Sequence, residues 1–144
     1  MMDLLNKLTN QIIRHEGVQL KPYKCPAGYL TIGAGRNLEG KGITFAEAMD
    51  LLQNDIDECT DDLSDIFSQF AVLPENIQHV LVDMRLNLGY NGFREFKKLI
   101  QAVKDKNWQA MKENMVMSLW YRQVGDRSKN LVKMVCEVIN EGKK

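Results

Sequence analysis

The chain has 144 residues, 44% of them apolar and 26% charged, which is typical of a globular domain and excludes a disordered segment. Its 19 basic and 19 acidic residues give a formal net charge of zero, and without a recognised nucleic-acid-binding motif we expect no nucleic-acid partner. The sequence has no run of about 18 apolar residues, so no membrane span is expected.

The first expected element is an amphipathic helix that begins near Asp3 and ends at Glu16. Its apolar side chains recur at helical spacing: Leu4, Leu5, Leu8, Ile12 and Ile13. Gly17 follows, a residue that tolerates the left-handed conformation in which helices often end. Glu16 is therefore expected at the end of a rigid element.

The next residues predict a small β-hairpin within 23–36. Pro26-Ala27-Gly28 is typical of a tight turn, and the alternation in Tyr29-Leu30-Thr31-Ile32 is typical of a strand. Cys25 stands just before the turn and Thr31 on the returning strand. We therefore expect these two side chains to lie close together across the hairpin.

The rest of the chain predicts a series of helices. Their expected starts are a capping box at Thr44-Phe45-Ala46-Glu47, Pro74 at a first helical position, and caps at Asn107 and Asp126. The first of these helices can run for up to about 25 residues. Gly89 is expected to end the second, and a short helix follows within 93–103. The expected fold class is α+β, mostly helical with a small hairpin sheet.

The three cysteines are an odd number without metal-ligand spacing, which argues against a disulfide framework and a metal site. Cys59 and Cys136 fall in helical patterns and are expected to be small, buried or half-buried apolar residues. Cys25 has the unusual setting. Nearby cations lower the pKa of a thiol, and Lys21 and Lys24 are candidates in the sequence.

Charge is segregated along the chain. Residues 42–84 contain ten acidic side chains and no Lys or Arg, whereas residues 85–144 contain 13 Lys or Arg and six acids. Both stretches can simply be solvated surfaces. Alternatively, the basic part steers the protein to an anionic polymer.

Glu16, Cys25 and Thr31 are separated by eight and five residues, and Ile32-Gly33-Ala34-Gly35 follows them. This pattern resembles the phage-type lysozymes (endolysins) related to the T4 enzyme, glycoside hydrolase family 24, in the branch with Cys in place of the catalytic Asp. Gly42-Ile43-Thr44-Phe45-Ala46-Glu47-Ala48 resembles the start of that family's long helix. Ser118-Leu119-Trp120-Tyr121, with Arg127 further on, resembles its C-terminal signature. The resemblance covers essentially the whole chain.

The resemblance implies one lysozyme domain over residues 1–144. A small lobe with the hairpin spans about 14–58, and a helical lobe spans about 59–144 together with the N-terminal helix. The implied activity is hydrolysis of the β-1,4 bond between N-acetylmuramic acid and N-acetylglucosamine in bacterial peptidoglycan, used in host-cell lysis. The implied enzyme is a monomer that needs no cofactor or metal.

The N-terminus has neither a basic segment nor an unbroken apolar core, so no signal peptide is expected. The protein should remain in the host cytoplasm until it is released to the cell wall. By resemblance to endolysins, this release depends indirectly on a holin.

The resemblance also implies roles for single residues. Glu16 is the general acid, and Arg127 orients it. Thr31 positions a water, and Cys25 acts as a base, a covalent nucleophile or an electrostatic stabiliser, of which we favour the base. The implied substrate contacts are Asn114, Asn37, Leu86 and Phe96. Arg36 stands where the T4-like members carry a His.

Several of these residues also have ordinary structural readings. Gly33-Ala34-Gly35 lacks the third glycine and following helix of a phosphate loop, so it is expected to let a sugar approach the backbone or to form a bulge. Trp108 and Trp120 lie at helical core spacing and are expected to pack in the core rather than against sugars.

Two other functions compete with the lysozyme reading. One is a cysteine amidase or peptidase of the cell wall that uses Cys25 with His15 or His79. The other is a non-catalytic glycan-binding relative that has lost its Asp. Muropeptide products separate the three, because a glycosidase creates reducing ends, an amidase creates peptide termini, and a binder creates neither.

Overall fold

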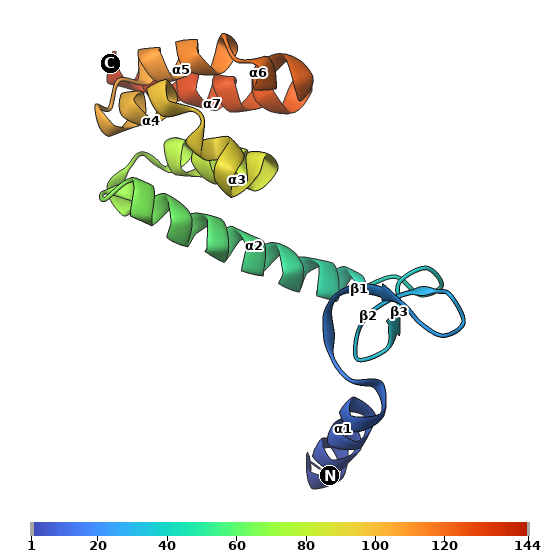
Figure 1. The fold of residues 1–144 in the computed structure, drawn as a ribbon. Coiled ribbons are helices and arrows are strands. Elements are labelled where there is room, and N and C mark those ends of the chain that lie inside the picture. Colours follow the sequence, from blue (N-terminus) through green and yellow to red (C-terminus); the bar gives the residue numbers. More distant parts are fainter. Residues whose placement is uncertain (1, 144) are drawn as a thin grey trace. The chain divides into compact units, whose positions relative to one another are not determined.

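In the computed structural model, which describes residues 2–143, the chain is mostly helical with one small sheet (Figure 1). The elements in chain order are α1 (Met2–Glu16), β1 (Gln19–Lys24), β2 (Leu30–Gly33), β3 (Arg36–Asn37), α2 (Phe45–Ile66), the 3-10 helix η1 (Phe70–Val72), α3 (Glu75–Arg94), α4 (Lys97–Lys104), α5 (Trp108–Val116), α6 (Leu119–Gln123) and α7 (Asp126–Gly142). The expected α+β class is confirmed. The chain divides into two compact units, one up to Leu51 and the other from Leu52 on, and each is described by itself.

In the first unit, α1 ends where the sequence predicts. Gly17 takes φ +71°, and its N–H donates to the carbonyl of Ile13 at 2.7 Å. A residue with a Cβ would be strained in this conformation, so the glycine terminates the helix directly after Glu16. Glu16 is thereby fixed to the last turn of a 15-residue helix.

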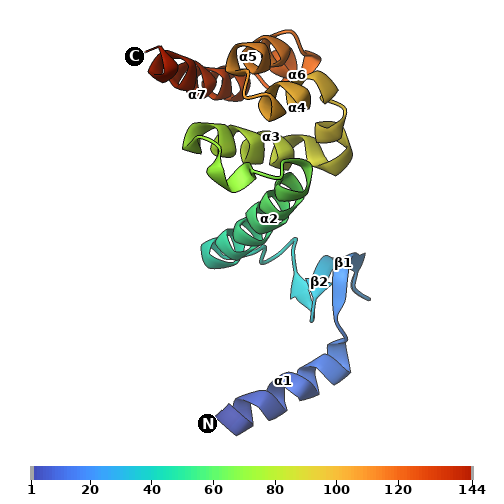
Figure 2. The same cartoon turned by 90° about the vertical axis from the view of Figure 1, so that its left-hand side faces the viewer.

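The sheet is antiparallel with the order β1-β2-β3, and Figure 2 shows β1 and β2 side by side. Thr31 pairs with Tyr23 of β1 on one side and with Asn37 of β3 on the other. A register shift interrupts β1 between Gln19 and Tyr23. The predicted hairpin is confirmed, and β3 extends it by a strand that the sequence did not indicate. Thr31 therefore lies on the central strand.

The capping box at the start of α2 is confirmed. The Thr44 hydroxyl accepts the N–H of Glu47 at 3.1 Å, and the Glu47 carboxylate accepts the N–H of Thr44 at 2.9 Å. Two otherwise unpaired N–H groups are satisfied in this way. The helix runs for 22 residues, within the predicted length.

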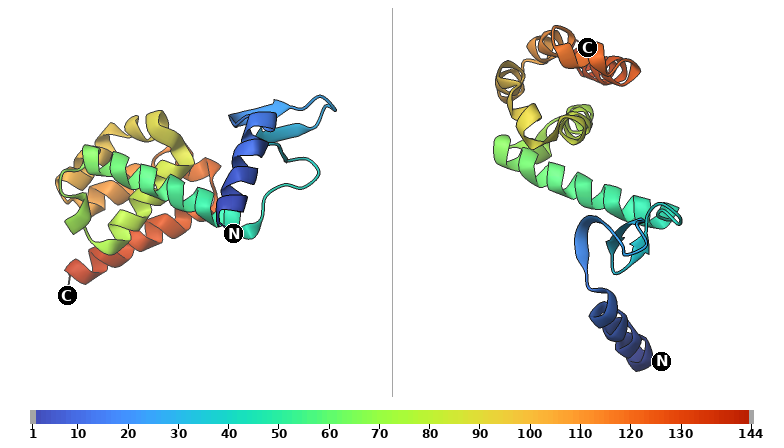
Figure 3. Two further views of the ribbon diagram at one scale, coloured as in Figure 1. Left: turned by 90° about the horizontal axis from the view of Figure 1, so that it is seen from below. Right: turned by 45° about the vertical axis from the view of Figure 1, so that its right-hand side comes forward.

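In the second unit, α3 and α5 pack on α7, α4 packs on α5, and α6 joins α7 (Figure 3). Fully buried side chains from α2, α3, α4, α5 and α7 form the core: Leu63, Ile77, Val80, Leu81, Met84, Phe93, Leu99, Val103, Met111, Met115 and Val135. These are the periodic apolar positions of the sequence. No helix among residues 2–143 is long and apolar enough to cross a membrane.

Some predicted helix boundaries were wrong by one residue or more. Pro74 has ψ 141°, so it is the cap before α3 rather than its first residue. Gly125 caps α7, and Asp126 is the first helical residue. Gly89 ends a helix as predicted, but helical structure resumes directly after it, so Phe93 belongs to the end of α3. The Asn107 cap is confirmed, because its side chain accepts the N–H of Ala110 at 3.0 Å.

Candidate active site

The Glu16 carboxylate lies against the turn that joins β2 to β3. A Cβ built on Gly35 would come within 3.0 Å of Glu16 Oε2 and 3.1 Å of its carboxyl carbon. Gly35 also has φ +88°, a conformation that favours glycine. The segment Gly33-Ala34-Gly35 is therefore a tight turn, and the group that approaches its backbone in the structure is the side chain of Glu16.

Cys25 follows β1 and opens the β1–β2 turn. Its N–H donates to the carbonyl of Tyr29 at 2.9 Å, and its carbonyl accepts the N–H of Gly28 at 2.8 Å. Thr31 is buried, and its hydroxyl donates to the same Tyr29 carbonyl at 2.8 Å. The turn thus brings the Cys25 thiol next to the Thr31 hydroxyl, as the hairpin pattern predicts.

The hydrogen-bond environment of Cys25 favours its thiolate. The pKa of the thiol is lowered, chiefly because the backbone N–H of Tyr29 can donate to the sulfur. Partial burial opposes this shift, while the N–H groups of Ala27 and Gly28 and the Thr31 hydroxyl add to it. Backbone N–H groups of the turn are therefore the main cause of the lowered pKa, whereas the sequence suggested Lys21 and Lys24 as candidates.

Asn37 serves the loop that leads to α2. Its side-chain oxygen accepts the N–H of Gly40 at 2.9 Å, and its carbonyl accepts the N–H groups of Lys41 and Gly42 at 3.1 and 3.2 Å. One end of the side-chain amide is thus used to hold a turn. Its expected contact with substrate remains a prediction for the other end.

Arg36, in the position where the T4-like members carry a His, ties β3 to the start of α2. Its Nη1 atom donates to Glu47 Oε1 at 2.7 Å and to the carbonyl of Gly42 at 3.2 Å. The hydrogen bond from Arg36 is the largest cause that lowers the pKa of Glu47 to about 2. Because Arg36 neighbours Asn37, which pairs with Thr31, this ion pair fixes the edge of the sheet that carries the candidate site.

The other predicted site residues belong to the second unit. Arg127 pairs with Asp83, with Nε and Oδ1 2.6 Å apart, and its Nη2 donates to the Asp83 carbonyl at 3.3 Å. Both side chains are about two-fifths exposed. The orientation of Glu16 by Arg127 remains a prediction.

Two of the expected substrate contacts, Asn114 and Phe96, line one open hollow of about 380 Å³. Lys97, Lys98 and Ser118 lie on its walls. Leu86 instead lines a separate, more apolar groove of about 510 Å³ between α2 and α3. The structure therefore brings Asn114 and Phe96 together and places Leu86 in another depression.

Residues 13–134 match the phage lysozyme family, a stretch that contains Glu16, Cys25, Thr31 and Arg127. The chain belongs to the phage lysozyme family. A peptidoglycan hydrolase, gp36 of Pseudomonas phage phiKMV, is 25% identical over 128 residues, which cover 85% of this chain and 14% of the relative. The probable T4-type lysozyme 1 of Dictyostelium discoideum is 23% identical in an alignment of 162 positions that covers 92% of this chain and 95% of the relative.

A third relative is the pre-baseplate central spike protein Gp5 of Enterobacteria phage T4. It is 23% identical in an alignment of 156 positions that covers 89% of this chain and 27% of that protein. The chain therefore spans only a small part of two of these relatives and nearly the full length of the third.

In this phage lysozyme family member, the two tryptophans are structural, as expected. Trp120 is 5% exposed, and its Nε1 donates to the Asn87 side chain at 2.8 Å. Its ring meets that of Phe96 edge to face, with 6.5 Å between the centroids. Trp108 is half-buried against the same core. Trp120 thus packs against Phe96, which lines the hollow.

Cys59, Cys136 and His79 belong to the second unit. Cys59 is buried and Cys136 half-buried, which confirms the sequence reading. His79 lies 3.7 Å from Glu75, one turn away on its own helix, and both side chains are mostly exposed. The surroundings of His79 therefore do not support the hypothesis that it forms a catalytic pair with Cys25.

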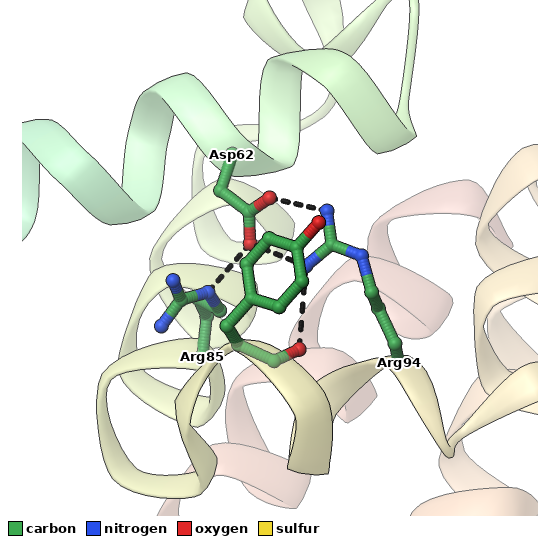
Figure 4. A network of polar contacts seen from close by, with 4 residues as sticks. Asp62, Arg85 and Arg94 are labelled. Atoms are coloured by element: carbon green, nitrogen blue, oxygen red, sulfur yellow. Dashed lines mark hydrogen bonds and ion pairs between the residues drawn. The ribbon is translucent and has the colours of Figure 1, made fainter.

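Sequence reasoning missed a buried polar network in the second unit (Figure 4). Asp62 of α2 accepts Arg85 Nε at 2.6 Å and Arg94 Nη1 at 2.8 Å, and its other oxygen bonds Arg94 Nη2. Asp62 and Arg85 are each less than a tenth exposed. A signal was present, because Arg85 stands at core spacing between Leu81 and Leu88 on α3.

Proposed function

We propose that the protein is a lysozyme that hydrolyses the β-1,4 bond between N-acetylmuramic acid and N-acetylglucosamine in bacterial peptidoglycan. The observation that carries this proposal is the Cys25 thiol, beside the Thr31 hydroxyl and in surroundings that favour the thiolate. Membership of the phage lysozyme family and the names of the peptidoglycan hydrolase and T4-type lysozyme relatives support it.

Glycoside hydrolysis requires an acid for the leaving oxygen and a second group for the sugar or the attacking water. Protonated Glu16 gives its proton to the glycosidic oxygen as the bond from that oxygen to the anomeric carbon breaks. Its fixed place at the end of α1, against the Gly35 turn, limits the positions that the acid can take.

Thr31 and Cys25 act together on the water. The Thr31 hydroxyl proton is directed to the Tyr29 carbonyl or to the neighbouring Cys25 sulfur, and in both arrangements the Thr31 oxygen can accept a hydrogen bond from the water. The Cys25 thiolate takes the other proton as the water oxygen bonds the anomeric carbon. The water attacks from the face opposite the leaving group, so the product anomer is inverted.

The residues of the second unit supply binding in this proposal. Arg127 orients Glu16, while Asn114 and Phe96 contact the glycan strand from the hollow that they share. Asn37 and Leu86 are weaker candidates, since Asn37 holds a turn and Leu86 lines another groove. The proposed partner is the peptidoglycan strand, the proposed active form is a monomer, and no cofactor enters the reaction.

Muropeptide analysis tests the class of reaction. Purified peptidoglycan incubated with the protein should yield fragments with new reducing ends and no new peptide termini. Free peptide or amino termini would instead establish an amidase or peptidase. Retention on peptidoglycan without any product would establish a glycan-binding relative.

For the biological role, we propose phage-type lysis in which a holin releases the protein from the host cytoplasm. Cells that express the protein should remain intact until a pore-forming agent breaches the inner membrane, and should then lyse abruptly. Lysis on expression alone would contradict dependence on a holin.

A further inference from the structure

Tyr90 combines exposure with an unusually fixed position. Its ring lies on the guanidinium of Arg94, with 3.5 Å between Cζ and the ring centroid, and the Arg85 guanidinium is 5.7 Å away. The residue is nevertheless 54% exposed. One face of the ring is thus occupied by a cation while much of the side chain faces solvent.

The break at Gly89 places the ring there. Gly89 has φ 79° and ψ 175°, which only glycine adopts readily, and helical structure resumes at Tyr90. The chain therefore changes direction between Arg85, before the break, and Arg94, after it. Tyr90 and Arg94 belong to the same short helical segment, and Arg94 Nη1 donates to the Tyr90 carbonyl at 3.2 Å.

The guanidinium under the ring is held by several hydrogen bonds. Arg94 donates to both oxygens of Asp62, and Arg85 holds one of them from the other part of α3 (Figure 4). Hydrogen bonds from Arg94, the larger cause, and from Arg85 lower the pKa of the Asp62 carboxyl. The network therefore keeps its charges through the neutral range. An exposed side chain on such a base has little conformational freedom left to lose when a ligand binds.

We propose that Tyr90 is a stacking platform for a sugar ring of the glycan strand, held in place by Asp62, Arg85 and Arg94. The apolar C–H face of a pyranose ring matches an exposed aromatic face, whose π electrons attract weakly positive hydrogens. Glu95, the residue after Arg94, lines the hollow that contains Phe96 and Asn114. This inference rests on the proposed function and adds a binding position that the family resemblance does not give.

The structural alternative is that the ring only shields the ion pairs from water. The two roles differ in what they require. Shielding contributes to the free energy of unfolding and leaves affinity unchanged, whereas a platform contributes to affinity for glycan. Tyr90→Phe keeps the aromatic face, and Tyr90→Leu keeps apolar cover without it.

The test is sedimentation binding of the full chain to purified peptidoglycan sacculi, in a Glu16→Gln background that prevents turnover. We expect Tyr90→Ala and Tyr90→Leu to weaken binding by about tenfold, the size of losing one aromatic anchor, and Tyr90→Phe to remain within about twofold. Phe45→Ala, which removes another exposed ring, is the matched control and should bind normally. In the active enzyme, Tyr90→Leu should raise KM and leave kcat unchanged.

Unchanged binding of Tyr90→Ala and Tyr90→Leu to the sacculi would overturn the platform hypothesis. An equal loss of binding in Phe45→Ala would also overturn it. Chemical unfolding of each variant separates the roles, and failure of both Tyr90 variants to fold would assign the ring to the fold. If the wild-type enzyme releases reducing ends while Tyr90→Leu binds normally, only the platform fails. If the wild type releases none and the Glu16→Gln parent does not bind, the proposed function itself fails.

Discussion

At the scale of single residues, Cys25 is the position where surroundings decide chemistry. As a base it must be a thiolate, a form that its lowered pKa favours, and the rate should depend on the fraction of thiolate. Cys25→Asp should keep substantial activity and extend it to lower pH, because a carboxyl ionises at lower pH than a thiol. Cys25→Ser should lose most activity, since the hydroxyl does not ionise near neutral pH.

Initial rates of reducing-end release from purified peptidoglycan, measured across pH, check this prediction. Cys59→Ser and Cys136→Ser are matched controls, because they remove thiols outside the proposed site. A fully active Cys25→Ala enzyme would contradict every catalytic role of the thiol.

Gly35 tests whether the position of Glu16 matters. Gly35→Ala adds a Cβ 3.0 Å from Glu16 Oε2 at φ +88°, so we expect the acid to be displaced and kcat to fall at least tenfold. Gly33→Ala is the control, because its φ is +70° and its Cβ would meet no atom within 4 Å. Both should destabilise the fold by about 1 kcal/mol through backbone strain. Equal kcat values for the two variants would contradict the role of this contact.

At the scale of elements, the link between β3 and α2 has a defined pH dependence. The pKa of Glu47 is lowered from 4.5 to about 2, so its stabilisation is present above the unfolded value and disappears as pH falls towards 2. Glu47→Gln should therefore be less stable than the wild type at pH 6, and the difference should shrink between pH 4.5 and 2. Urea unfolding at several pH values measures this. A difference that stays constant with pH would show that the charge of Glu47 does not contribute.

The join between α2 and the two parts of α3 depends on Asp62. Asp62→Asn leaves Arg85 buried without its carboxylate, and we expect the free energy of unfolding to fall by about 3 kcal/mol. Asp61→Asn, an exposed neighbour on the same helix, should change it by less than about 0.5 kcal/mol. Comparable losses in the two variants would mean that α2 charge in general, rather than this network, governs stability.

Sequence patterns predicted these elements unevenly, for physical reasons. Helical periodicity identifies the buried face of α3, and Gly89 marks the break in it. The sequence did not indicate that helical structure resumes directly after Gly89, so Phe93 was assigned to the next helix instead of the end of α3. Local caps were recognisable at Thr44 and Asn107, where one side chain satisfies one nearby amide. The caps at Pro74 and Gly125 use no side-chain hydrogen bond, which explains the errors of one residue.

At the scale of the whole molecule, the α+β class and the family were accessible from the sequence because they depend on periodicity and on spacing along the chain. The pairing of Cys25 with Thr31 followed from the hairpin. The contribution of the turn amides to the thiolate could not be predicted from the sequence, because the direction of a backbone N–H depends on the folded turn. The network of Asp62, Arg85 and Arg94 joins residues far apart in sequence, which a pattern read in one window does not connect.

The central claim is that Glu16 delivers the proton that breaks a glycosidic bond. Its most direct test is the rate of reducing-end release from purified peptidoglycan by the wild type and by Glu16→Gln, an isosteric amide that cannot donate the proton. We predict that the wild type releases reducing ends and that Glu16→Gln is slower by about 10² to 10⁴, with an unchanged free energy of unfolding. A Glu16→Gln enzyme with most of the wild-type rate would contradict the account.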